Sequence, residues 1–158
     1  IDLMSQNDIK YLKIKNGFVY TVNEDVQICK VLDTFIEKKI GSCMVEDSDK
    51  KFIGIMTEKD AIKCFKDVQK FSDIKVKDIM TKYENIIIAS EDDNIQYAMS
   101  IMTEKRIKHL PIMKDTDVIG VISIGDIVKA QLEHSEHIAK TYLDHIKGET
   151  PQPHNQEY

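Results

Sequence analysis

Two copies of one short motif hold the side chains of this chain that are best suited to chemistry. Each copy pairs a hydroxyl residue with an aspartate three places later, Thr57 with Asp60 and Ser123 with Asp126. In the simplest interpretation, such a pair is a capping box at the start of a helix. The same geometry suits a ligand, because the free N–H groups of a helix start and a nearby hydroxyl bind phosphate. An ionised aspartate accepts hydrogen bonds from both hydroxyls of a ribose. The motif therefore indicates either helix capping or a nucleoside phosphate site.

A glycine stands three residues before each hydroxyl, at Gly54 and Gly120. Because glycine lacks Cβ, a flat base can approach the strand backbone closely at these positions. We therefore include both glycines among the candidate site residues.

The motif belongs to a longer internal repeat. An offset of 67 residues lays residues 21–45 over residues 88–112, and an offset of 66 lays Gly54 over Gly120. The offset changes by one between Val45 and Gly54, where a polar stretch predicts a hairpin turn that absorbs the change. One unit of about 60 residues therefore occurs twice. Because a lone unit of that size is only marginally stable, we expect the two to pack as one body.

Each unit is predicted to run strand, helix, strand, strand, helix, which makes the fold class mixed α/β (α+β). Apolar residues at helical spacing predict a first helix that ends near Lys39 or Arg106. Short apolar runs predict the strands, at residues 43–45, 52–56, 110–113 and 118–122. A second helix begins at Thr57 or Ser123, and we expect its apolar stripe to be buried. The stripe residues are Ala61, Ile62, Cys64 and Phe65 in the first unit and Ile127, Val128, Ala130 and Leu132 in the second.

These elements divide the chain into six segments. A mostly polar stretch after the second unit predicts a further helix, and the proline-containing end has the composition of a flexible tail. The expected segments are an N-terminal segment that completes the module (1–18), repeat 1 (19–66), a linker (67–85), repeat 2 (86–132), a C-terminal helix (133–147) and the tail (148–158).

The composition excludes several classes of function. The chain has 158 residues and a net charge of −5, which gives no reason to expect nucleic-acid binding. Its longest apolar run, near residues 118–124, is too short to cross a membrane. Cys29, Cys43 and Cys64 form no C-x-x-C pair and fit small buried residues in a reduced, intracellular setting. Because the first residue is Ile1, we expect that the native N-terminus is missing.

Neither catalysis nor metal binding has a residue pattern to support it. No Ser-His-Asp set, Walker loop or dinucleotide-fold glycine pattern occurs, so the chain is not expected to be an enzyme. His134 and His137, with His145 further along, have spacing that could present imidazoles on one helix face. No fourth ligand stands at a recognised spacing, and a polar, exposed helix is the favoured interpretation.

Over about residues 19–132 the chain resembles a tandem pair of CBS domains, also called a Bateman module. The most specific stretches are residues 78–81 (DIMT), 102–112 (MTEKRIKHLPI) and 120–126 (GVISIGD). Together with Leu12 to Lys15 and the helix after Leu132, they are most similar to small stand-alone CBS-pair proteins of bacteria and plant mitochondria. The resemblance implies two clefts related by pseudo-twofold symmetry that bind AMP, ADP, ATP or NAD. It also implies a homodimer that regulates another protein without catalysis, in the cytoplasm or mitochondrial matrix.

The resemblance further implies a role for individual residues. Asp60 and Asp126 would hold ribose hydroxyls, while Thr57 and Ser123 would bond phosphate. The base in the Asp60 cleft would be bordered by Asp78, Ile79, Met80, Thr81 and Ile107. The base in the Asp126 cleft would be bordered by Lys13, Ile14, Lys15 and Ile40. Phosphate charge would be met by Lys59, Arg106, Lys108 or His109. The basic run of Lys105, Arg106, Lys108 and His109 also fits a solvated helix end.

Two alternatives to a nucleotide sensor stay open at this point. The first is a CBS-type dimerisation scaffold whose two motifs only cap helices. The second is a regulatory CBS insert of a larger enzyme such as inosine monophosphate dehydrogenase. The repeats also differ in sequence, since Cys43 and Met44 stand where the second repeat has Leu110 and Pro111. The two clefts are therefore expected to be unequal, and their ranking is open.

Overall fold

A computed structural model of the chain describes residues 8–12, 19–65 and 73–147. Repeat 1 has a four-stranded sheet in the order β1-β2-β3-β4. Its strands are β1 (Thr21–Asn23), β2 (Ser42–Glu46), β3 (Phe52–Thr57) and β4 (Thr81–Lys82). The β1–β2 pair is parallel and the other two pairs are antiparallel. Helices α1 (Ile28–Lys38), α2 (Glu58–Cys64) and α3 (Val76–Ile79) complete this repeat.

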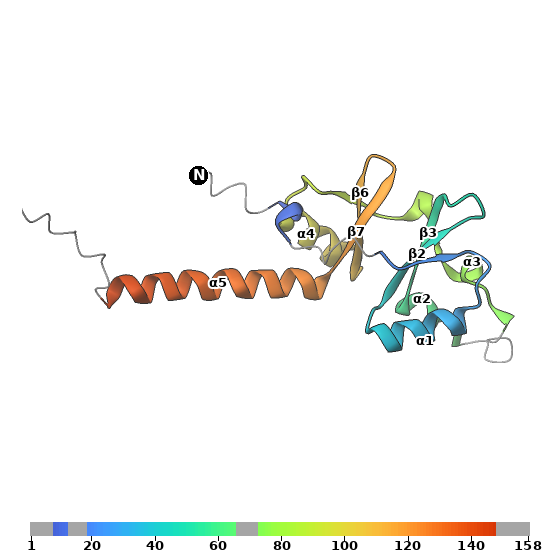
Figure 1. Ribbon diagram of the computed structural model, residues 1–158, viewed down its shortest axis with the longest axis horizontal. Helices are drawn as coiled ribbons and strands as arrows, with labels where there is room; N and C mark the ends of the chain where they lie inside the picture. The colour runs from blue at the N-terminus through green and yellow to red at the C-terminus, as the bar shows by residue number, and fades with distance from the viewer. Residues whose placement is uncertain (1–7, 13–18, 66–72, 148–158) are drawn as a thin grey trace, which may run out of the picture.

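Repeat 2 has the same plan with one strand fewer in the described residues. Its sheet has the order β5-β6-β7. The strands are β5 (Ala89–Ser90), β6 (His109–Lys114) and β7 (Asp117–Ser123), and the helices are α4 (Ile95–Lys105) and α5 (Ile124–Ile146). Short 3-10 helices lie at η2 (Ile9–Tyr11) and η4 (Tyr83–Asn85). Each repeat has its own cluster of buried apolar residues, so two small cores lie side by side (Figure 1).

The strand registers confirm the internal repeat. Val45 pairs with Gly54 in repeat 1, and Ile112 pairs with Gly120 at the equivalent place in repeat 2. Each hairpin has a register shift one residue beyond that pair, and the longer turn of repeat 1 absorbs the change of offset. The first helices also end alike, since Lys39 and Arg106 both have a φ of 53° in the left-handed region. The predicted helix ends are therefore confirmed.

The N-terminal segment packs on repeat 2 and not on the repeat that follows it in sequence. Ile9 is fully buried in the repeat 2 core, and its N–H donates to the Asp93 carbonyl at 2.9 Å. The segment before repeat 2 packs on repeat 1 in the same way, with the Val76 N–H donating to the Val26 carbonyl at 2.8 Å. Figure 1 shows η2 beside α4, far from the sheet of repeat 1. Each repeat is thus completed by the segment that precedes the other one.

The end of the fold differs from the predicted pair of separate helices. The second helix of repeat 2 and the expected helix at 133–147 form one continuous helix, α5, of 23 residues. The reason is local, because residues 131–134 contain neither glycine nor proline to interrupt it. Helix α5 projects well away from both repeats (Figure 1). The predicted tail at 148–158 lies outside the described residues. No described helix is long and apolar enough to span a membrane.

Two expectations about burial are wrong. Half of each second-helix stripe is exposed: Ile62 (65%), Phe65 (55%), Val128 (50%) and Leu132 (59%). Ala61 and Ile127 are buried in the cores and Cys64 and Ala130 are partly buried, so only the other four apolar positions face outward. Of the three cysteines, only Cys43 is fully buried, and burial raises the pKa of its thiol to about 12. Cys29 and Cys64 lie at helix positions near the surface.

Candidate functional site

Both hydroxyl–aspartate pairs form capping boxes. The backbone N–H of Thr57 donates to Asp60 Oδ2 at 2.9 Å, and its hydroxyl donates to the same oxygen at 3.1 Å. Ser123 makes the same two contacts to Asp126 Oδ2, at 2.9 and 2.8 Å. In both pairs one carboxylate oxygen, Oδ2, holds the helix start, and the contacts from the hydroxyl residue do not involve Oδ1. A capping role therefore leaves one oxygen of each aspartate for a ligand.

The two aspartates differ in exposure although their local sequences match. Asp60 is only 8% exposed, and Lys63 Nζ lies 3.8 Å from its Oδ1. Asp126 is exposed, and no described cation forms an ion pair with it. A diol could reach Asp126 directly, whereas most of Asp60 is covered and its Oδ1 already faces Lys63.

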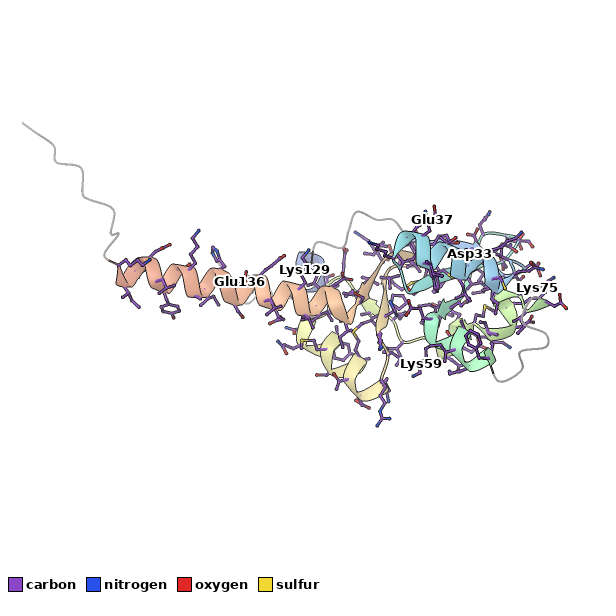
Figure 2. The ribbon with its side chains drawn as sticks, turned by 90° about the horizontal axis from the view of Figure 1, so that it is seen from below. Asp33, Glu37, Lys59, Lys75, Lys129 and Glu136 are labelled. Atoms are coloured by element: carbon purple, nitrogen blue, oxygen red, sulfur yellow. The ribbon has the colours of Figure 1, made fainter. Side chains whose placement is uncertain are left out.

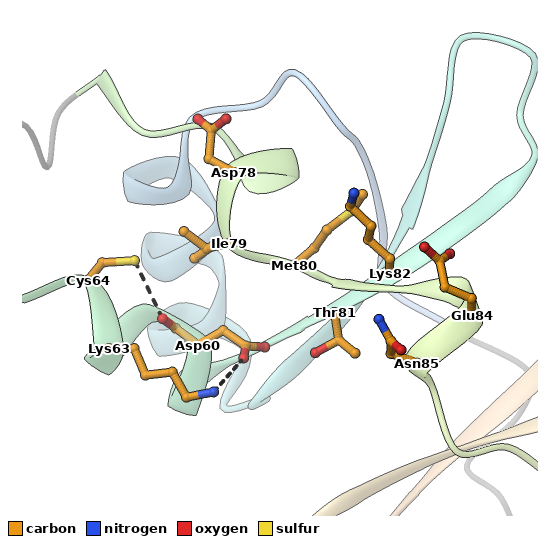
Figure 3. A pocket seen from close by; sticks show the side chains of 10 residues that line it. All are labelled: Asp60, Lys63, Cys64, Asp78, Ile79, Met80, Thr81, Lys82, Glu84 and Asn85. Carbon is orange, nitrogen blue, oxygen red and sulfur yellow. Dashed lines mark hydrogen bonds and ion pairs between the residues drawn. The ribbon is translucent and has the colours of Figure 1, made fainter.

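The hollow beside Asp60 is small and belongs to repeat 1. Its volume is about 650 Å³, and the segment from Asp78 to Thr81 forms one wall (Figure 3). Lys63 and Lys82 line it together with three carboxylates, those of Asp60, Asp78 and Glu84. The structure thus brings the predicted base-bordering segment next to Asp60. Ile107 does not line this hollow and instead packs against the core of repeat 2.

Gly54 has a structural reason to lack a side chain. A Cβ at this position would lie 2.6 Å from Met80 Sδ and 2.8 Å from the Thr81 carbonyl oxygen. The absent side chain therefore allows β4 to approach β3, rather than leaving a gap for a base. Thr57 and Gly54 do not line the Asp60 hollow.

The cavity beside Asp126 is larger and lies between the two repeats. Its volume is about 1490 Å³. From repeat 1, Ile40 and its neighbours in the sequence line the cavity. From repeat 2, the lining residues include Gly120, Ser123, Asp126 and His109. Ile40 and the four residues of repeat 2 were candidates from the sequence, and the structure brings them together. Lys13, Ile14 and Lys15, predicted for this cleft, lie outside the described residues.

Several residues that line the Asp126 cleft were not predicted from the sequence. They are Tyr20 and Lys38 from repeat 1 and Lys129, Glu133, His134 and His137 from α5. The Lys38 ammonium lies 5.8 Å from the centre of the Tyr20 ring. Lys129 had a visible signal, because a lysine follows the aspartate by three places in both repeats, at Lys63 and Lys129. The others had none, because their approach to Asp126 depends on tertiary packing.

His109 lies at the contact between the repeats. A Cβ added to Gly41 would be 3.1 Å from two atoms of its ring and 3.2 Å from the Glu58 carboxyl carbon. Burial lowers the pKa of His109, and the carboxylates of Glu58 and Asp126 oppose this effect while Lys108 adds to it. His109 therefore stands where a phosphate in the Asp126 cleft would change its protonation.

The other predicted cations lie elsewhere. Lys59, Arg106 and Lys108 are exposed and line neither cavity. Figure 2 labels Lys59, which lies on α2. Across the described residues, no group of three His, Cys, Asp or Glu side chains could hold a metal ion. His134 and His137 thus line the nucleotide-sized cleft without forming such a group.

Known proteins resemble this chain over most of its length. A family model described as the CBS domain matches residues 2–67 and 76–133. A CBS-domain containing protein of Agrobacterium tumefaciens, ATU1752, has a solved structure that is 32% identical with a TM-score of 0.75, covering 83% of this chain and 98% of that one. The CBS domain pair of protein MJ0100, solved with 5′-methylthioadenosine and S-adenosyl-L-methionine, is 25% identical with a TM-score of 0.66, covering 78% and 98%.

A curated relative matches more closely over a shorter stretch. The mitochondrial CBS domain-containing protein CBSX3 of Arabidopsis thaliana is 38% identical over 89 residues, which are 55% of this chain and 43% of the relative. The chain thus spans less than half the length of that relative.

Proposed function

Because this chain belongs to the CBS-domain family and contains two copies of the domain, we propose that it is a non-catalytic regulatory module that binds an adenine nucleotide. The observation that carries the proposal is the exposed carboxylate of Asp126, which lies in a cleft between the repeats together with Ser123 and His109. A ribose diol would bond Asp126 and a phosphate would bond Ser123. The ligand class is AMP, ADP, ATP or NAD.

We rank the Asp126 cleft as the site that fills first. Its volume exceeds that of the Asp60 hollow, and its aspartate needs no rearrangement. Charge favours the same order, since three lysines (Lys38, Lys39 and Lys129) line this cleft against the carboxylates of Asp126 and Glu133. The Asp60 hollow has more carboxylates than lysines. An anionic phosphate is therefore attracted more strongly to the Asp126 cleft.

The regulatory part of the proposal concerns the relation between the repeats. A ligand that contacts both repeats in the Asp126 cleft stabilises one relative orientation of them. The chain would act as a homodimer inside the cell, in the cytoplasm or the mitochondrial matrix, and another protein would respond to that orientation. The mitochondrial location in the name of CBSX3 supports the second compartment.

A thermal-shift screen tests the proposal. The ligands are AMP, ADP, ATP, NAD and S-adenosylmethionine, the last because MJ0100 was solved with it. A ligand at 100 times its dissociation constant adds about 2.7 kcal/mol of apparent stability. A rise in Tm with one of the nucleotides supports the sensor. No rise with any of them contradicts it and favours the scaffold, whose hydroxyl–aspartate pairs only cap helices.

A further inference from the structure

The second half of α5 has no cover from the other residues that the structure describes. Every residue from Leu132 to Lys147 is exposed. The helix has 23 residues and is about 35 Å long, and Figure 1 shows its C-terminal half beyond both repeats. In proteins, most of the stability of a helix comes from the packing of its apolar face and not from intrinsic helix propensity. Something that packs on α5 would explain why the helix continues past repeat 2.

One face of α5 carries large apolar residues in both halves of the helix. These exposed residues recur at steps of four, apart from one step of six between Leu132 and Ile138: Ile124, Val128, Leu132, Ile138, Tyr142 and Ile146. At about 100° per residue these positions form a single stripe. The residues of α5 that line the Asp126 cleft, such as Glu133 and His137, lie on the opposite face. We call the apolar stripe the α5 stripe.

Exposure within the α5 stripe is large for apolar side chains. Tyr142 is 68% exposed and Ile146 is 80% exposed, and both lie in the projecting half. A contiguous apolar strip on a helix marks a surface that another protein covers. The partner must therefore present an elongated apolar face of similar length.

We propose that the α5 stripe packs against the α5 stripe of a second copy of this chain, with the two helices antiparallel. A crossing point near residue 133 places Ile124 opposite the partner's Tyr142. It also places Val128 opposite the partner's Ile138 and Leu132 near its own counterpart. All of the large apolar side chains from Ile124 to Tyr142 thus gain an apolar neighbour. This inference deepens the proposed homodimer by naming its surface.

Charge beside the α5 stripe favours the antiparallel orientation. Lys129 and Glu136 lie along the same edge of the stripe, and neither forms an ion pair within the described chain (Figure 2). In an antiparallel pair, equal edges face each other, so Lys129 meets the partner's Glu136 and the contact occurs twice. In a parallel pair, this edge would face the edge that holds His134 and Thr141, which offers no carboxylate. Opposite charges at such flanking positions set orientation in helix pairs.

Sedimentation equilibrium of the whole chain over a concentration series tests the interface. Ile138→Glu places a charge in the α5 stripe and is expected to weaken dimerisation at least tenfold. Thr141→Glu adds the same charge three residues away, outside the stripe, and is expected to change it less than threefold. Both positions are exposed, so neither variant should unfold. A dimer that persists unchanged in Ile138→Glu overturns this interface and leaves the proposed homodimer standing. A wild-type chain that stays monomeric overturns both.

A charge exchange tests the orientation. Lys129→Glu and Glu136→Lys are each expected to weaken the dimer, and the double variant to restore it to within threefold of wild type. Failure of the double variant to restore it contradicts the antiparallel arrangement. Because Lys129 also lines the Asp126 cleft, these measurements are made without nucleotide. Nucleotide binding is scored separately, so failure of this interface and failure of the sensor are distinguishable.

Discussion

Lys63 Nζ lies 3.8 Å from Oδ1 of Asp60, and the described residues show no such contact between the equivalent Lys129 and Asp126. The two lysines occupy the same place in the repeat, three residues after the aspartate. One is paired with its own aspartate, and the other lines a cleft large enough for a nucleotide. The two sites thus have the same residue types but differ in whether the lysine is paired with its own aspartate.

Lys129→Gln is expected to weaken nucleotide binding, because it removes a positive charge from the Asp126 cleft. Exposed charge pairs contribute up to about 1 kcal/mol, so the dissociation constant should rise about twofold to fivefold. The effect should be greater for ATP than for AMP and should shrink at high salt. Lys63→Gln is the matched control and should change affinity less. Calorimetric titrations measure all four combinations, and equal losses from both variants would contradict the ranking of the clefts.

Gly54→Ala should destabilise the fold by about 1–3 kcal/mol, because the added methyl meets Met80 Sδ and the backbone of β4. Gly125→Ala is the control. Its added Cβ would have Ser123 Oγ, at 3.6 Å, as its nearest neighbour, and alanine favours the helix. Urea unfolding gives both free energies. A Gly54→Ala chain as stable as wild type would show that β4 does not press against β3.

Ile9→Ala should destabilise the chain by about 2–5 kcal/mol, because Ile9 is fully buried in the core of repeat 2. Ile36→Ala, on a side chain that is 78% exposed, should change stability by less than about 0.5 kcal/mol. Hydrogen exchange shows which part of the chain is destabilised, and the loss of amide protection should concentrate in β5, β6 and β7. Loss confined to repeat 1 would contradict the packing of the N-terminal segment on repeat 2.

Stability should fall as the pH drops below about 6.5, in part through His109. Burial lowers the pKa of His109 from its ordinary value of 6.5 in the folded chain, so the unfolded chain takes up the proton first. The contribution of His109 is fully present above pH 6.5 and is lost as the pH falls towards the folded pKa. Unfolding free energies from pH 8 to 5 measure the slope, and His109→Gln should flatten it. The same slope in both proteins would show that His109 is not the group responsible.

The repeat itself was readable in the sequence, because conserved spacing within a chain needs no tertiary information. Val45 and Gly54 align with Ile112 and Gly120 in the sequence repeat, and the structure gives both pairs the same place in their hairpins. The exposure of Ile62 and Val128 was not readable, since helical spacing shows a face and not what covers it. The position of Ile9 was not readable either, because its contacts lie more than 80 residues away.

The sequence predicted two unequal clefts, but it did not predict which aspartate is the exposed one. Thr57–Asp60 and Ser123–Asp126 have the same local pattern, so only tertiary packing separates a buried aspartate from an exposed one. The lining by His134 and His137 depends on α5 continuing past Leu132 without a break. The sequence contains no glycine or proline at residues 131–134 that would end the helix, but a boundary between two segments was expected there.

Calorimetric titration of AMP and ATP into the wild-type chain, Asp126→Asn and Asp60→Asn tests the central claim most directly. Asparagine retains an oxygen that can cap the helix, so each variant should keep its fold. Asp126→Asn is expected to weaken the tightest site at least tenfold, while Asp60→Asn should leave that site within about threefold of wild type. Unchanged affinity in Asp126→Asn, or a greater loss in Asp60→Asn, would contradict that claim.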